Sequence, residues 1–332
     1  MKKRLSLLFA LAAFVLSSCV HEFPHNADTV TVLLTIKHRL DWTEYEYIVD
    51  GSRAASAQAR YRVEAYAPGT TGAPAHTFTF YRDDLSLADF TAELQLPPGQ
   101  WELRAWQDIT VQGDEPFYNA DNFAAISMVR PYRGDTDRRD AFEGLTSVTV
   151  PETFMADTRA EATMEMERPL AKYVFIATDF DKFYNETVIG SRGDEASRWE
   201  DLSPEQQQIA LSRYNVVGVY PFYMPAVYNM FTERVVNSWT NMSYTATVRP
   251  LSPTEAIIAM DYVFINHHES GAQVQLGLKM PDGQTLRLTD VITVPLLRGQ
   301  ITYVRGKFLT TSAGSGIDID FEFSGDINIK IP

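Results

Sequence analysis

Short segments in which apolar and polar residues alternate constrain the fold of this chain more than any other feature. In Tyr61–Tyr66, Arg62 and Glu64 alternate with apolar residues, and Trp101–Trp106 shows the same pattern. A period of two places successive side chains on opposite faces of a β-strand. Each such strand is therefore expected to lie in a sheet with one buried face and one face in water.

Similar segments recur along the whole chain. The predicted strands are residues 29–36, 61–66, 77–81, 90–96, 101–106, 146–150, 162–167, 172–180, 216–220, 244–249, 256–264, 273–279, 285–289, 301–309, 317–323 and 327–331. Many short strands separated by turns indicate antiparallel sandwiches or barrels and not a parallel α/β sheet. No repeat with a period of about 20 to 50 residues is visible, so propellers and solenoids are not expected.

One short helix is predicted in the second half of the chain. Ser203 is placed to cap its N-terminus, Pro204 occupies the first helical position and Gln206 completes a capping box. Apolar residues then continue to Leu211. We expect this helix to be an insertion between strands.

Length and pattern together predict two domains. At about 150 residues per domain, the chain is long enough for two hydrophobic cores. The strand pattern is interrupted around Arg168 and Pro169. The predicted fold is all-β, with an N-terminal β-sandwich in residues 29–167, a C-terminal β-sandwich in residues 168–332 and one short inserted helix.

The N-terminus has the features of a bacterial lipoprotein signal. Residues 1–18 carry Lys2, Lys3 and Arg4 followed by an apolar run from residue 5 to residue 16, which is shorter than the roughly 20 residues that a membrane span needs. Leu16-Ser17-Ser18-Cys19 matches a lipobox, in which the cysteine thiol receives the lipid. We expect Cys19 to be the acylated first residue of the mature chain and residues 19–28 to form a lipidated tether.

Charge and cysteine content exclude several classes of function. Removal of residues 1–18 leaves 26 basic and 43 acidic residues, a net charge of −17. An acidic surface repels phosphate backbones and anionic headgroups, so nucleic acid is not an expected partner and membrane attachment must come from the lipid. Cys19 is the only cysteine, so neither a disulfide nor a thiol catalyst is expected.

Four stretches resemble the fimbrillin-like lipoproteins of Bacteroides and Porphyromonas relatives, a family that includes fimbrial subunits and anchors. They are the lipobox at Cys19, Arg-Gly-Asp-Thr-Asp-Arg-Arg-Asp-Ala-Phe-Glu-Gly at 133–144, Arg-Pro-Leu-Ala-Lys-Tyr at 168–173, and the segment from Val294 to Thr310. The resemblance implies two tandem transthyretin-like sandwiches and a lipid anchor in the cell outer membrane, on its surface or periplasmic face. It also implies a structural or adhesive role in a fimbria, with other fimbrillin-like subunits as partners.

The same resemblance implies that subunits exchange β-strands. The terminal segment Ile327–Pro332 could complete its own domain or insert into a neighbour, and both readings stay open. In polymerising members a protease removes the first strand after an arginine, and Arg39 and Arg53 lie in that region. An anchor subunit would keep the strand.

Catalytic residues, cofactors and metal ligands are not predicted. The adjacent His267 and His268 would point to opposite faces of a strand, and no motif for a nucleophile, zinc or phosphate is present. The acidic run contains closely spaced carboxylates at Asp135, Asp137, Asp140 and Glu143. It is interpreted as a solvated turn with internal ion pairs, and a calcium loop is the alternative.

A glycan-binding surface lipoprotein of a polysaccharide-uptake system is the alternative function. Trp106 falls on the face opposite Leu103 and is the candidate for stacking on a sugar, whereas Trp101 is assigned to the core. Two Arg-Gly-Asp tripeptides, at 133–135 and 192–194, are candidates for recognition by a host integrin. Thr29 follows an aspartate in the tether and fits a short O-glycosylation signal.

Overall fold

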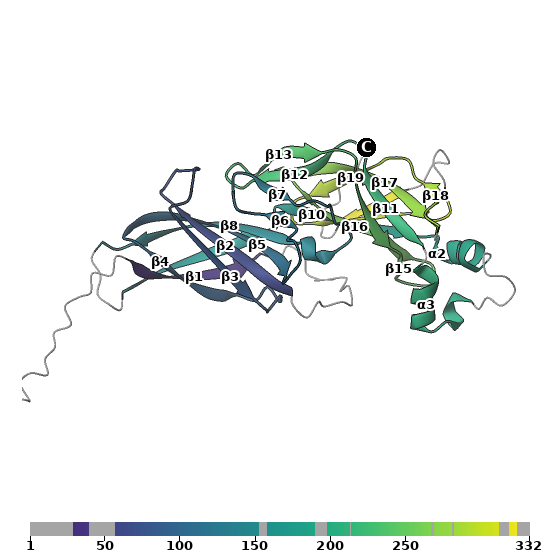
Figure 1. Ribbon diagram of the computed structural model, residues 1–332, viewed down its shortest axis with the longest axis horizontal. Helices are drawn as coiled ribbons and strands as arrows, with labels where there is room; N and C mark the ends of the chain where they lie inside the picture. Colours follow the sequence, from purple (N-terminus) through teal and green to yellow (C-terminus); the bar gives the residue numbers. More distant parts are fainter. Residues whose placement is uncertain are drawn as a thin grey trace, which may run out of the picture.

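The computed structural model describes residues 29–39, 57–152, 158–189, 198–212, 214–266, 269–280, 282–311 and 319–323. Within these residues the chain is built mainly of β-strands, so the predicted all-β class is confirmed. Figure 1 shows the sheets formed by the first half of the chain beside those formed by the second half, along the long axis of the molecule.

One seven-stranded sheet forms the first half, in the order β3-β2-β5-β8-β9-β1-β4. Its strands are β1 (Val30–His38), β2 (Ala57–Tyr66), β3 (His76–Arg82), β4 (Phe90–Leu96), β5 (Gly99–Val111), β8 (Ala141–Val150) and β9 (Arg159–Glu167). All neighbours are antiparallel except β1 and β9, which are parallel. β8 and β9 pair over only two residues of each strand. The sheet is therefore divided at this point into two layers, β3-β2-β5-β8 and β9-β1-β4.

The core of the first half lies between these layers. Val32, Leu34 and Ile36 of β1 are fully buried in one apolar cluster with Val63 of β2 and Leu103 of β5. The alternation in the sequence thus places one face of each strand in this core. Trp101 packs against the cluster and its indole Nε1 donates a hydrogen bond to the Pro97 carbonyl at 2.9 Å, which agrees with its assignment to the core.

Three further sheets contain the second half. One has the order β15-β16-β10-β20-β21, a second has the order β14-β11-β17-β18 with β19 also paired to β17, and the third has the order β13-β12-β7-β6. The strands are β10 (Leu170–Ala177), β11 (Asn215–Tyr220), β12 (Met224–Asn229), β13 (Arg234–Trp239), β14 (Met242–Thr247), β15 (Arg249–Pro250), β16 (Ala256–Phe264), β17 (Glu269–Lys279), β18 (Thr285–Leu288), β19 (Ile292–Leu297), β20 (Ile301–Gly306) and β21 (Ile319–Phe323).

The third of these sheets combines strands from both halves of the sequence. β6 (Tyr118–Asn119) and β7 (Ile126–Met128) precede residue 168, yet β7 pairs with β12. Figure 1 shows β6 and β7 next to β12 and β13. The segment between β5 and β8 therefore packs on the second half of the chain. The domain boundary between residues 167 and 168 stays a prediction.

Helices are short and confined to connections. They are the 3-10 segments η1 (Asp137–Arg139) and η3 (Trp199–Asp201), the π-helical segment η2 (Tyr184–Ile189), and the α-helices α2 (Phe180–Phe183) and α3 (Pro204–Leu211). The predicted capping box is present in α3, because Ser203 N donates to Gln206 Oε1 at 2.9 Å and Gln206 N donates to Ser203 Oγ at 3.3 Å. In the described part of the chain, no helix has the length and hydropathy that a membrane span requires.

Two predicted strands are too long. The segment predicted as 172–180 stops at Ala177, and Phe180 begins α2. The segment predicted as 301–309 stops at Gly306. Asp179 accounts for the second of these ends, since its carboxylate accepts hydrogen bonds from the backbone N–H of Leu309 and Thr310 and so fixes a turn beyond β20.

Candidate functional site

The outer face of β2, β5 and β8 is covered by β6 and by strands of the second half of the chain, and we call this region of contact the junction. Trp106 lies on this face with 0% of its surface exposed, and its ring centroid is 5.5 Å from that of Tyr118 and 6.4 Å from that of Phe264. The prediction that Trp106 is a glycan contact is wrong, because a buried ring offers no face to a sugar. The alternation in β5 correctly placed Trp106 and Leu103 on opposite faces of the strand, but both faces are buried.

The acidic run between Asp135 and Glu143 lies at this junction and is not solvated. Each of its four carboxylates is largely buried and forms an ion pair with a cation from later in the chain. The pairs are Asp135 with Arg249 at 2.6 Å, Asp137 with Lys172 at 2.6 Å, Asp140 with Arg168 at 2.8 Å and Glu143 with Arg298 at 2.6 Å. The interpretation as a solvated turn with internal ion pairs is therefore wrong, because the carboxylates are buried and pair with cations outside the run.

The alternative interpretation, a calcium loop, does not fit this site either. Lysine and arginine side chains already occupy the carboxylates that a calcium loop would offer to the ion. Across the residues that the structure describes, no group of three or more His, Cys, Asp or Glu side chains could hold a metal ion.

A fifth buried pair joins Arg139 to Asp261 of β16. Arg139 Nε lies 3.1 Å from Asp261 Oδ1, and both side chains are almost fully buried. Tyr132 and Tyr220 donate hydrogen bonds to Asp261 Oδ2. Burial raises the pKa of Asp261, while Arg139 and the two hydroxyl donors oppose that rise.

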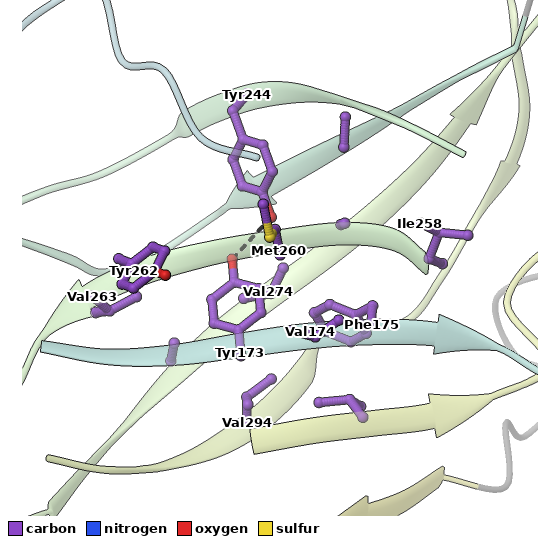
Figure 2. Packing of buried hydrophobic residues seen from close by; sticks show 14 of the residues in the cluster. Tyr173, Val174, Phe175, Tyr244, Ile258, Met260, Tyr262, Val263, Val274 and Val294 are labelled. Atoms are coloured by element: carbon purple, nitrogen blue, oxygen red, sulfur yellow. Dashed lines mark hydrogen bonds between the residues drawn. The ribbon is translucent and has the colours of Figure 1, made fainter. Parts of the chain in front are cut away.

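A tyrosine cluster extends this network into the core of the second half. The Tyr173 hydroxyl is 2.7 Å from that of Tyr220 and 3.0 Å from that of Tyr244. Figure 2 shows Tyr173 and Tyr244 joined in this way among the apolar side chains of β10 and β16. Burial raises the pKa of each of these hydroxyls well above its usual value, so they remain neutral donors and acceptors.

The first Arg-Gly-Asp tripeptide serves the same junction. A Cβ on Gly134 would lie 2.5 Å from Cγ of Tyr244, so only glycine lets the backbone approach that ring. Asp135 adopts a left-handed conformation with a φ of 58° and binds Arg249. Its carboxylate is thus occupied and not presented to an integrin. The second tripeptide, at 192–194, lies outside the described residues.

A cleft with a volume of about 280 Å³ opens beside the ion pairs. Its charged lining residues are Arg39, Arg104, Glu143, Glu165, Glu167 and Glu233, from both halves of the chain. Arg298 contacts three of these carboxylates: Glu143 at 2.6 Å, Glu233 at 3.0 Å and Glu167 at 3.4 Å. Burial raises the pKa of Glu143 to about 7, against the attraction of Arg298.

Sheet edges are a second kind of candidate site. Among the described residues, β3 pairs only with β2, β4 only with β1, and β21 only with β20. An edge strand presents unpaired backbone N–H and C=O groups to any strand that can pair with it. The predicted terminal strand at Ile327–Pro332 lies outside the described residues.

Several predicted positions have limited structural context. Arg39 follows β1, where its backbone N–H donates to the Met166 carbonyl at 2.8 Å. Thr29 directly precedes β1, and its hydroxyl donates to Gln95 Oε1 at 3.5 Å. Cys19, Arg53 and the pair His267 and His268 lie outside the described residues. Lipidation and O-glycosylation stay predictions.

The sequence signal for the junction was present but was not interpreted. Lys172 lies within the apolar strand β10, and Arg249 and Arg298 each directly follow a mainly apolar or β-branched stretch, where a charge needs a partner. Arg168 lies between β9 and β10. Pairing each of them with one carboxylate of the run at 135–143 required the tertiary contacts.

The sequence model of a family of unknown function (DUF6562) matches residues 26–332. No curated protein matches the chain. Solved structures that resemble it include a fimbrial assembly protein from Parabacteroides distasonis, with 12% identity, a TM-score of 0.40, and coverage of 89% of this chain and 95% of that chain. The fimbrial anchor protein Mfa2 from Porphyromonas gingivalis has 10% identity, a TM-score of 0.39, and coverage of 89% and 98%. The tip fimbrial protein Mfa3 from the same organism, with C-terminal truncation, has 8% identity, a TM-score of 0.41, and coverage of 89% and 99%.

Proposed function

We propose that this chain, which belongs to the family of unknown function DUF6562, is a lipid-anchored, fimbrillin-like structural or adhesive subunit of a surface fimbria. It acts as an anchor, accessory or tip component. The observation that carries this proposal is that, among the described residues, β3, β4 and β21 each have one edge without a strand partner.

Strand pairing supplies the physical basis of subunit contact. A strand added to an open edge gains main-chain hydrogen bonds, and alternating side-chain pockets fix its register. The tyrosine of β3 at position 81 is 55% exposed, so this edge offers apolar contact as well. Other fimbrillin-like subunits are the proposed partners.

The first strand remains part of the fold in this proposal. β1 lies between β9 and β4, and Val30, Val32, Leu34 and Ile36 are buried in the core. Removal of β1 would expose an apolar groove along both neighbours. An anchor subunit that keeps β1 has no such groove and offers its outer edges instead.

Attachment to the outer membrane is the second part of the proposal. It is supported by the lipobox at Cys19 and by Val20, which replaces the aspartate that retains many lipoproteins in the inner membrane. Stable anchoring takes two acyl chains, since each buried methylene contributes about 0.8 kcal/mol. Mass spectrometry of the mature N-terminus tests this part, and a first residue other than acylated Cys19 would reject it.

Co-assembly with a purified fimbrillin-like subunit tests the role in a fimbria. The test variant replaces the three apolar residues of the last segment, Ile327, Ile329 and Ile331, with serine. The control replaces Asn328 and Lys330, which alternate with them, with serine. We expect only the first variant to lose co-assembly in native mass spectrometry.

Circular dichroism and thermal unfolding must show that both variants are folded. If the folded triple variant assembles as well as the wild type, the terminal segment is not the contact. If the wild type also fails to bind any such subunit, the fimbrial role is rejected. The glycan-binding alternative has lost its candidate residue, because Trp106 is buried.

A further inference from the structure

One of the five buried ion pairs at the junction differs from the others in its cation. Arginine side chains supply the positive charge of four pairs, at residues 139, 168, 249 and 298. In the fifth pair, Nζ of Lys172 lies 2.6 Å from Oδ1 of Asp137. A guanidinium stays protonated in proteins, whereas a lysine amine becomes a nucleophile once it loses a proton. Of these five pairs, the one between Lys172 and Asp137 can therefore react.

The backbone holds both partners of this pair in place. Asp137 opens η1, where its carbonyl accepts a hydrogen bond from Asp140 N at 3.1 Å. Lys172 lies on β10, directly opposite Tyr262 in the register of β10 and β16. Figure 2 shows Tyr262 on the strand next to the one that carries Tyr173. Groups that the fold holds in contact need no diffusional encounter, which raises the rate of a reaction between them.

The surroundings of the pair exclude water. The side chains of Lys172 and Asp137 are 2% and 10% exposed. All residues of β10 and β16 are buried. The Tyr262 ring lies beside the ammonium group, with its centroid 5.4 Å from Nζ of Lys172. Burial of two charges carries a large desolvation cost, which a neutral amide in the same place would avoid.

One oxygen of Asp137 lacks a hydrogen bond. Its Oδ1 accepts hydrogen bonds from Nζ of Lys172 at 2.6 Å and from the Tyr262 hydroxyl at 2.9 Å. Its Oδ2 is buried and has no partner within the described residues. A buried polar atom without a partner destabilises the fold. Departure of Oδ2 would remove this atom from the core.

We propose that Lys172 and Asp137 become joined by an isopeptide bond, an amide between Nζ and Cγ. One ammonium proton first moves to Oδ2, which gives a neutral amine and a neutral carboxylic acid. Nζ then attacks Cγ, and the Tyr262 hydroxyl donates to the negative charge that develops on Oδ1. Oδ2 takes a second proton from Nζ and leaves as water. The C–N bond thus replaces a C–O bond, and no oxidant or reductant is required.

The bond would connect the two halves of the chain covalently. Asp137 and Lys172 are 35 positions apart, on either side of Arg168. The chain contains a single cysteine and cannot form an internal disulfide. Unlike an ion pair, an amide persists in acid, in salt and in the unfolded chain. In a subunit of a fimbria it would resist separation of the halves under force, but the chemistry does not depend on that role.

Tryptic digestion and mass spectrometry of the purified full-length chain test the proposal. Trypsin cleaves after Arg133 and Arg138, but it does not cleave at a lysine whose amine is part of an amide. The bond between Arg168 and Pro169 also resists trypsin. We expect a branched peptide of residues 134–138 and 160–182, lighter by one water molecule than the sum of its two parts. The linear peptide of residues 134–138 should be depleted.

Two lysine variants assign the bond. Lys172→Arg keeps a positive charge beside Asp137 but cannot form the amide, so the branched peptide should be absent. Lys182→Arg is the matched control, because Lys182 pairs with Glu186 at 4.0 Å and both side chains are more than half exposed to water. This control should yield the branched peptide as the wild type does.

A tyrosine variant tests the reaction step. Tyr262→Phe should slow bond formation by roughly 10²- to 10³-fold, the usual effect of a lost oxyanion donor. The rate is measured on chains diluted from urea into folding conditions and sampled over time. Tyr228→Phe is the control, because its hydroxyl donates to Glu143 in another pair, and its rate should equal that of the wild type. Equal rates in the two variants would overturn the step assigned to Tyr262.

Two results would overturn the proposal as a whole. The first is a wild-type chain that yields only the linear peptide of residues 134–138, a result that needs no variant to fold. The second is a loss of water without a branched peptide, because an aspartate succinimide, for example at Asp282-Gly283, has the same mass change. Such a loss would persist in Lys172→Arg. Circular dichroism confirms that the compared variants are folded.

Discussion

At some positions near the junction, the residue type is set by close packing against a neighbouring ring and not by the alternation of apolar and polar residues. Gly218 lies on β11, and a Cβ there would be 2.4 Å from Cζ of Tyr244. A Cβ on Gly134 would meet the same ring at its Cγ end. Tyr244 is therefore enclosed by two glycines while its hydroxyl reaches Tyr173. Nothing in the sequence around either glycine identifies the ring that it contacts.

The variant Gly218→Ala tests this packing. Overpacking of a filled core typically costs about 1 to 3 kcal/mol, so we expect a loss of that size in the free energy of unfolding measured with urea. Gly72→Ala is the control, because a Cβ at Gly72 meets no atom within 4 Å. A Gly218→Ala protein as stable as the wild type would contradict the enclosed position of Tyr244.

His38 makes stability depend on pH. Burial beside Phe142 and Tyr61 lowers the pKa of His38 from 6.5 to about 4. Between these values the unfolded chain binds a proton that the folded chain does not, so this histidine contributes stability above pH 6.5 that is lost as pH falls towards 4. The full effect is on the order of 3 kcal/mol at 1.36 kcal/mol per unit.

We expect His38→Gln to have a flatter pH profile of unfolding free energy than the wild type between pH 6.5 and 4. Other titrating groups, including Glu143, are present in both proteins and cancel in the difference. Urea unfolding at several pH values measures it. Parallel profiles would show that His38 is protonated equally in the folded and unfolded chains.

At the scale of elements, the two halves share one arrangement of strands. In the first half β1 is parallel to β9, and in the second half β10 is parallel to β20. In each half the opening strand thus lies beside one from near its end. Such pairs close a long loop, so their formation needs contacts that hold the distant segments together.

Asp179 supplies one of these contacts in the second half. It follows β10, and its carboxylate accepts hydrogen bonds from Leu309 N at 3.3 Å and from Thr310 N and Oγ1 at 2.7 Å each. Asp179→Ala should lower the free energy of unfolding by about 2 to 3 kcal/mol, because hydrogen bonds to a charged group are lost together. Thr310→Val removes only one of the three and should cost less. Equal losses measured by urea unfolding would contradict this account.

Strand prediction succeeded where one face of a strand meets a core. β1, β2, β4 and β16 were predicted within a few residues of their observed bounds, because their apolar residues recur at the period of a strand or form a continuous β-branched run. The strands β6, β7, β12, β13 and β19 were not predicted. β6 and β7 have two and three residues, and β12 and β19 contain proline, so their local patterns are weak.

At the scale of the whole molecule, buried ion pairs connect the two halves. Arg139 precedes β8 and pairs with Asp261 of β16, and both side chains are shielded from water. Arg298 bonds in turn to Glu143 of β8. These ion pairs hold the two halves together, because separating the halves would leave buried charges unpaired.

The variant Arg139→Met tests this coupling. Loss of one partner of a buried pair typically costs about 3 to 5 kcal/mol, so we expect a decrease of that size in the unfolding free energy. Arg159→Met, at an exposed position of β9, is the control and should change stability by less than about 0.5 kcal/mol. The double variant Arg139→Met with Asp261→Asn should lose less than the sum of the two single losses. Strict additivity would show that the pair is not coupled.

Local sequence determined the strands with a clear apolar pattern, the capping box of α3 and the all-β class, because these depend on side chains within a few residues of one another. Tertiary structure alone decided the environment of Trp106 and the partners of the acidic run. The sequence pattern of a strand with one polar face is the same whether that face contacts water or the other half of the chain. Glu143 and Arg298 are 155 residues apart, so only the folded chain could bring them into contact.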